Sequence, residues 1–218
     1  MTSAAAGLAT SNESKTAPIQ AEIDRAIEGL LALLPNPEQL SAAERRGIIA
    51  RYTAVLEGNF IYWMTGAYIA VGSDSARAKI MDNLREEVRD CHPGMMRRFA
   101  LAANAIPTDA DAQAVHRNLM NVRLFIGRLT PVPIVVSMAF FEGFIQRFMP
   151  YLADLAQRQG SAEMEYTDVH GVCDITHTQE LFRALEAEMA LEPQTPEQEM
   201  FEGVQLLRTL IQNIVVNN

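Results

Sequence analysis

The sequence has few cysteines and few basic residues, and no long uninterrupted apolar run. Its two cysteines, Cys91 and Cys173, are too few for a disulfide framework, so we expect reduced thiols and a cytoplasmic protein. Lysine and arginine number 18 against 27 acidic residues, which gives a net charge of −9. This charge argues against a nucleic-acid partner and against an anionic membrane surface.

No segment has the pattern of a membrane span or an export signal. The opening stretch, MTSAAAGLATSNESKTAP, has neither the basic start nor the apolar centre of a signal peptide. We expect residues 1–17 to form a disordered tail and residues 18–218 to form one domain. The most apolar run, 131–141, is interrupted by Pro133 and is well short of the roughly 20 residues that a span needs. It is therefore expected to be a core helix.

Apolar residues recur at helical spacing through almost the whole chain, and no alternating pattern indicates a strand. We expect a short piece over 93–105, because the His92-Pro93 pair must interrupt a helix: proline disfavours helical backbone in the residue before it. Ser41, with Glu44 three residues later, predicts a capping box. The predicted helices are 18–34, 41–71, 74–91, 108–129, 132–159, 163–191 and 195–216. The fold class is therefore all-α, a compact seven-helix bundle.

The segment from His170 to His177, HGVCDITH, is the first candidate for chemistry. His170, Asp174 and His177 are separated by four and then three residues, so their side chains leave the same face of a helix. Two imidazoles and a carboxylate form a mixed N/O donor set that suits iron, manganese or zinc. Taken alone, the same pattern is equally typical of a hydrogen-bonded polar helix face.

Glu142 is the second candidate, because it lies in the apolar stretch VVSMAFFEGFI. An unpaired carboxylate buried there would cost several kcal/mol or take up a proton, and a metal ion would offset that cost. Two alternatives are a glutamate on the rim and a buried ion pair with an arginine such as Arg123.

The third element is the acidic pair Glu86 and Glu87, followed by His92. Together the three elements provide three carboxylates and three histidines on three helices. Helical bundles build two-metal sites from such groups, and six ligands leave positions open for O₂ and substrate.

In this order, the acidic pair with His92, the lone Glu142 and the His-x₃-Asp-x₂-His segment resemble the haem-oxygenase-like diiron oxidases and oxygenases. That family shares its seven-helix fold with haem oxygenase, the TenA-type thiaminases and the PqqC-type oxidases. The resemblance extends over about 19–216. It implies that Glu142 is a bridging metal ligand. It also implies that His92, His170, Asp174 and His177 are ligands, with Glu87 or Glu86 as the acidic partner of His92.

The acidic partner departs from a regular pattern. Glu87 and Glu86 lie five and six residues before His92, on a different face of a continuous helix. Either the helix ends or bulges before His92, or the ligand is an unexpected one. Glu87 is preferred to Glu86, with Asp82 third.

The resemblance implies a non-haem diiron enzyme that activates O₂, binds two Fe(II) ions and acts on a small amino-acid-derived or carboxylic acid. Manganese is an alternative metal. N-oxygenation, desaturation and oxidative C–C cleavage are the expected reactions, in specialised metabolite biosynthesis. An acid group on the substrate would suit Arg123, Arg128 or Arg147. A homodimer is also expected, since bundles of this kind commonly pair.

Two other functions remain open. One is a metal-free TenA- or PqqC-like enzyme of the same fold, in which Cys91 could act as a nucleophile. The other is a helical interaction module without catalytic activity, in which the histidines are structural.

Overall fold

The structure is a computed structural model that describes residues 15–191 and 195–216. Within these ranges the chain is helical and contains no strand, which confirms the all-α fold. The helices are α1 (Ala17–Leu31), α2 (Ala42–Ala70), α3 (Asp74–Arg89), α4 (His92–Ala102), α5 (Asp109–Ile126), α6 (Pro131–Arg158), α7 (Glu165–Leu191), α8 (Glu197–Met200) and α9 (Glu202–Val215). The expected short piece is thus a helix, α4, and the last predicted helix is divided at Phe201. Most of the expected tail, 1–14, lies outside the described residues.

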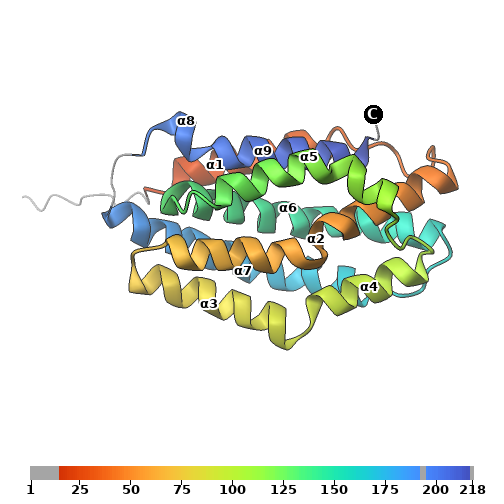
Figure 1. Cartoon of the computed structure of the whole chain (residues 1–218), viewed down its shortest axis with the longest axis horizontal. Helices are drawn as coiled ribbons and strands as arrows, with labels where there is room; N and C mark the ends of the chain where they lie inside the picture. Colours follow the sequence, from red (N-terminus) through yellow and green to blue (C-terminus); the bar gives the residue numbers. More distant parts are fainter. Residues whose placement is uncertain (1–14, 192–194, 217–218) are drawn as a thin grey trace, which may run out of the picture.

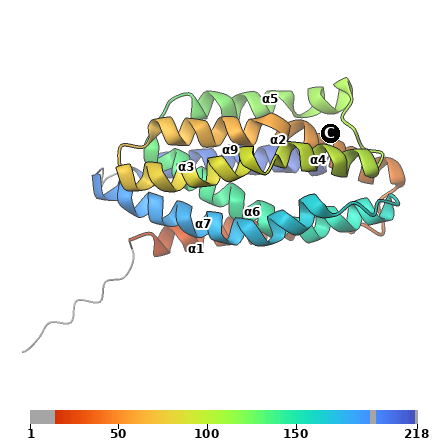
Figure 2. The ribbon, with the colours of Figure 1, turned by 90° about the horizontal axis from the view of Figure 1, so that it is seen from below.

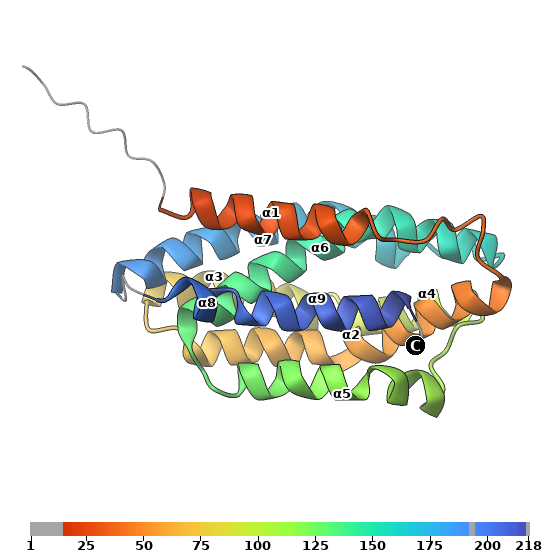
Figure 3. The same cartoon turned by 90° about the horizontal axis from the view of Figure 1, so that it is seen from above.

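The long helices run roughly along the longest axis of the molecule (Figure 1). Helix α6 is the central element and packs against α7, α2, α9 and α1. On one side α9 lies between α1 and α5 (Figure 3). On the other side α3 and α4 follow one another alongside α7 (Figure 2). The interior between α3, α4, α6 and α7 is therefore enclosed by segments far apart in the sequence.

Local sequence signals set several helix boundaries. The Ser41 side chain accepts from the Glu44 backbone N–H, and the Glu44 carboxylate accepts from the Ser41 backbone N–H, which confirms the capping box. Thr108 forms a second box with Asp111. The helix expected over 41–71 is interrupted at Glu57 and Gly58, where the backbone leaves the helical region.

The connection between α3 and α4 is the local feature that matters most for the site. Helix α3 ends at Arg89, and Cys91 adopts a left-handed conformation with φ 55° and ψ 47°. His92 then opens α4 directly before Pro93, whose missing N–H is tolerated in a first turn. The chain changes direction sharply here (Figure 1), which confirms that the helix breaks before His92.

Among the described residues, α6 is the one helix long and apolar enough to cross a membrane. However, 89% of its most apolar window is buried inside the bundle. This is the burial of a core helix, as expected for the run 131–141. The helix continues through Pro150 to Arg158.

Candidate metal centre

All six residues of the preferred ligand set lie in the interior between α3, α4, α6 and α7. Their exposed fractions range from 0% for Asp174 to 5% for His177. Three carboxylates and three imidazoles are rarely buried together without partners, since removing charges from water is costly. They form two clusters, with Glu142 between them.

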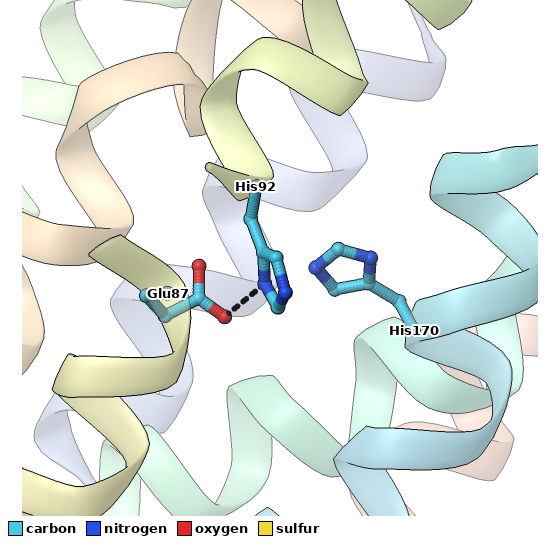
Figure 4. A group of neighbouring side chains, drawn as sticks. All are labelled: Glu87, His92 and His170. Atoms are coloured by element: carbon cyan, nitrogen blue, oxygen red, sulfur yellow. Dashed lines mark hydrogen bonds and ion pairs between the residues drawn. The ribbon is translucent and has the colours of Figure 1, made fainter. Parts of the chain in front are cut away.

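The first cluster consists of Glu87, His92 and His170, from α3, α4 and α7 (Figure 4). His92 Nδ1 lies 2.7 Å from Glu87 Oε1. The rings of His92 and His170 meet edge to face with their centroids 4.5 Å apart. One potential ligand atom from each of the three residues falls within 4.8 Å of the others. The break at Cys91 makes this possible, because it turns His92 back toward a carboxylate five residues earlier.

The orientation of His170 is set by its own helix. Its Nδ1 lies 2.8 Å from the backbone carbonyl oxygen of Tyr166, one turn earlier. A ring N–H at Nδ1 donates to this oxygen, which leaves the Nε2 lone pair free for a metal. Burial lowers the pKa of His170, which favours the neutral form that binds metals.

The second cluster lies on α7 and consists of Asp174, His177 and Cys173. His177 Nδ1 is 3.6 Å from Asp174 Oδ1. Both His177 Nδ1 and Asp174 Oδ2 are buried without a hydrogen-bond partner. Buried polar atoms without a partner are rare in folded proteins, and a bound metal ion would supply a partner for both of these atoms.

Glu142 lies between the two clusters. Its Oε1 is 3.7 Å from His177 Nδ1 and accepts a hydrogen bond from Asn83 Nδ2 at 2.7 Å. It also lines the same cavity as the first cluster. Burial, followed by the negative charge of Asp174, raises the pKa of Glu142 well above its usual value. A carboxylate placed against both clusters is suited to bridge two cations.

The two alternatives for Glu142 do not hold. Its exposed fraction is 1%, so it is not a rim residue. Arg123 donates instead to Asn59 Oδ1 and lies over the ring of Tyr62, so it forms no ion pair with Glu142.

The three acidic candidates on α3 contact different partners. Glu87 contacts His92, as preferred. Glu86 contacts a different histidine: its Oε2 lies 2.9 Å from His177 Nε2. Asp82 is exposed, and its carboxylate lies 3.4 Å from Arg85.

Sequence reasoning missed Asn83 as a partner of Glu142, although its place one turn before Glu87 on the same helix face was a usable signal. The Cys173 thiol is half-buried and donates to Asp174 Oδ1 at 3.1 Å. Burial and then the charge of Asp174 raise the thiol pKa, so Cys173 stays protonated as a donor.

A small cavity of about 20 Å³, room for about one water molecule, adjoins the first cluster. Among the described residues, no lysine or arginine lines it. Besides Glu87, His92, Glu142 and His170, it is lined by Leu56, Phe60, Ile61, Pro93, Met96, Ile145 and Tyr166. The arginines expected to hold a substrate acid group lie elsewhere: Arg128 pairs with Glu202, and Arg147 pairs with Asp24.

Carboxylates and histidines that project inward from facing helices are the groups from which helical bundles build dimetal centres. The chain matches the family described as iron-containing redox enzymes, of haem-oxygenase-like fold, over residues 49–210. It therefore belongs to that family, and the matched range contains every residue of both clusters. No curated protein and no solved structure gives a significant match.

Proposed function

We propose that this protein is a non-haem diiron oxygenase or oxidase. Glu87, His92 and His170 would hold one Fe(II) ion, Asp174 and His177 would hold the other, and Glu142 would bridge them. The observation that carries the proposal is the position of Glu142: it is buried beside His177 and lines the same cavity as the first cluster, and no arginine or lysine of the described residues pairs with it. Manganese suits the same donors and is the alternative metal.

Bound Fe(II) would supply the electrons with which O₂ is activated. The chain's own residues prepare the site for this. Asn83 holds one oxygen of Glu142, and the Tyr166 carbonyl fixes the His170 ring. The apolar wall formed by Leu56, Phe60 and Ile145 keeps bulk water away from the first cluster.

The proposed substrate is a small amino-acid-derived or carboxylic acid with an apolar body. The aliphatic and aromatic side chains around the cavity would contact such a body, and among the described residues no lysine or arginine lines it. N-oxygenation, desaturation or oxidative C–C cleavage, in a specialised biosynthetic pathway of the cytoplasm, is the proposed reaction class. A homodimer is part of the same proposal.

Anaerobic loading with Fe(II), followed by metal analysis and an oxygen-electrode measurement, tests the proposal. The wild-type protein should bind two iron ions and consume O₂. His170→Ala should lose at least one ion and lower O₂ consumption by about 100-fold or more, since metal-site changes typically cost 10- to 100-fold or more. His116→Ala is the matched control, because His116 is exposed on α5 and should leave both properties unchanged. A wild-type protein that binds no iron under these conditions contradicts the proposal.

A variant of Cys91 tests the metal-free alternative, in which this thiol is the nucleophile. This residue is exposed on the turn before α4. The diiron proposal predicts that Cys91→Ala retains iron binding and O₂ consumption, whereas a thiol-dependent enzyme would lose activity in this variant and keep it in His170→Ala.

A further inference from the structure

We propose that Glu86 is a positioning residue for His177, holding the ring through Nε2 so that Nδ1 is the atom that binds metal. This inference rests on the proposed function. It assigns different tasks to two consecutive glutamates: Glu87 belongs to the first cluster, and Glu86 supports the second from outside.

The contacts of the His177 ring determine its orientation. Nε2 lies 2.9 Å from Glu86 Oε2, a normal hydrogen-bond distance. Nδ1 lies 3.6 Å from Asp174 Oδ1 and 3.7 Å from Glu142 Oε1, and it has no hydrogen-bond partner. A ring N–H at Nε2 that donates to Glu86 leaves the Nδ1 lone pair directed at the two buried carboxylates, which is where an ion would be bound.

The same contacts argue against Glu86 as a ligand of that ion. The two nitrogens of an imidazole point in different directions, and Glu86 lies on the Nε2 side. Its side chain is 44% exposed, whereas the side chains of Asp174 and Glu142 are 0% and 1% exposed. Glu86 therefore reaches His177 from the solvent side of the site, opposite to the buried carboxylates.

Helix α3 contacts both Glu142 and His177. Glu86 and Glu87 follow Asn83 by three and four residues, so both lie one turn after it on the same side of the helix. Asn83 donates to Glu142, and Glu86 accepts from His177. Carboxylates that fix metal-binding histidines in this way commonly contribute 10- to 100-fold, or about 1.4–2.7 kcal/mol, to metal affinity.

The groove between α3 and α7 provides a matched control. Glu180 lines the same groove as Glu86 and His177, but its carboxylate binds Lys79 Nζ at 2.7 Å instead of a histidine. Glu180→Gln removes the same charge from the same groove as Glu86→Gln, without touching His177. A change in metal affinity that is seen in Glu86→Gln but not in Glu180→Gln is therefore due to the contact with the His177 ring and not to the loss of negative charge.

The test is an anaerobic titration with Co(II), followed by its visible absorption, on the full chain. The wild-type protein should bind two ions. Glu86→Ala should raise the Kd of one ion by about 10- to 100-fold and leave the Kd of the other unchanged. Glu86→Gln should have a smaller effect, because its amide oxygen still accepts from Nε2–H, and Glu180→Gln should have none.

Proton NMR of the Co(II)-loaded protein provides a readout independent of affinity. The wild-type protein should show a strongly shifted, solvent-exchangeable proton from His177 Nε2–H, and Glu86→Ala should lose it through fast exchange. The inference is overturned if Glu86→Ala binds the second ion as tightly as the wild type, or if Glu180→Gln weakens it equally. A wild-type protein that binds no ion overturns the proposed function as well, whereas two ions bound with the same affinities in the wild type and in Glu86→Ala overturn the inference alone.

Discussion

At the scale of single residues, the centre holds more negative charge than its histidines can balance. Burial alone would lower the pKa of His177, but interactions with Asp174, Glu142 and Glu86 outweigh it and raise the pKa to about 10. Burial and the negative charge of Asp174 likewise raise the pKa of Glu142 well above its usual value. In the metal-free protein, protons bound to His177 and Glu142 therefore offset negative charge that a metal ion would otherwise offset.

This leads to a prediction for the metal-free protein. A raised pKa in the folded state means that the contribution of His177 to stability is complete below about pH 6.5 and is lost as the pH rises toward 10. Glu142 also has a raised pKa in the folded state, so its contribution to stability likewise falls as the pH rises above the ordinary pKa of a glutamate. The free energy of unfolding should therefore fall between pH 6.5 and 9, by on the order of a few kcal/mol.

Urea denaturation of the chelator-treated protein across this pH range measures the effect. His177→Gln should show a flatter dependence on pH, and His116→Ala should behave like the wild type, because His116 is exposed. A wild-type stability that stays constant or rises from pH 6.5 to 9 would refute the prediction.

At the scale of helices, the position of α3 decides which of its residues reach the metal centre. Its first turn is tied to the far end of α7 by Glu188, which is 2% exposed. The Glu188 carboxylate accepts from the backbone N–H of Gly72 at 3.1 Å and of Ser73 at 2.6 Å. These bonds satisfy two backbone donors just before α3, where Ala76, three residues after Ser73, has no side-chain acceptor to complete a capping box.

Glu188→Ala should therefore lower the free energy of unfolding by about 2–4 kcal/mol, since it leaves two partly buried N–H groups without acceptors. Glu188→Gln should have an intermediate effect, because one amide oxygen remains to accept. Glu186→Ala, at an exposed position of the same helix, should change stability by no more than about 0.5 kcal/mol. Equal losses in Glu188→Ala and Glu186→Ala, measured by chemical denaturation, would count against this role of Glu188.

At the scale of the whole molecule, the proposed metal centre would connect four helices that are distant in the sequence. The proposed ligands lie on α3, α4, α6 and α7, so ion binding would join both halves of the chain. An ion that binds only the folded state stabilises it by mass action.

Fe(II) under anaerobic conditions should therefore raise the Tm. At a free metal concentration of about 100 times Kd, the gain of about 2.7 kcal/mol corresponds to roughly 5–10 °C for a chain of this size. A chelator should reverse the rise, and His170→Ala should show a smaller one. A Tm that is insensitive to both Fe(II) and chelator would instead favour the interaction module with structural histidines.

The sequence by itself determined the features that depend on neighbours within a few residues. These are the helical periodicity, the capping box at Ser41, the break before Pro93, and the shared face of His170, Asp174 and His177. Backbone sterics and the 3.6-residue repeat act locally, so they can be read without knowing what the helix packs against.

Only the tertiary structure decided what these features contact. The sequence could not separate Glu86 from Glu87, because the direction of His92 depends on the backbone conformation at Cys91 and on where α7 lies beside α3. It did not assign Asn83 to Glu142 for the same reason: the two residues are 59 positions apart and meet only when α3 packs near α6. Contacts of this kind depend on how whole helices pack, and no local sequence pattern encodes that packing.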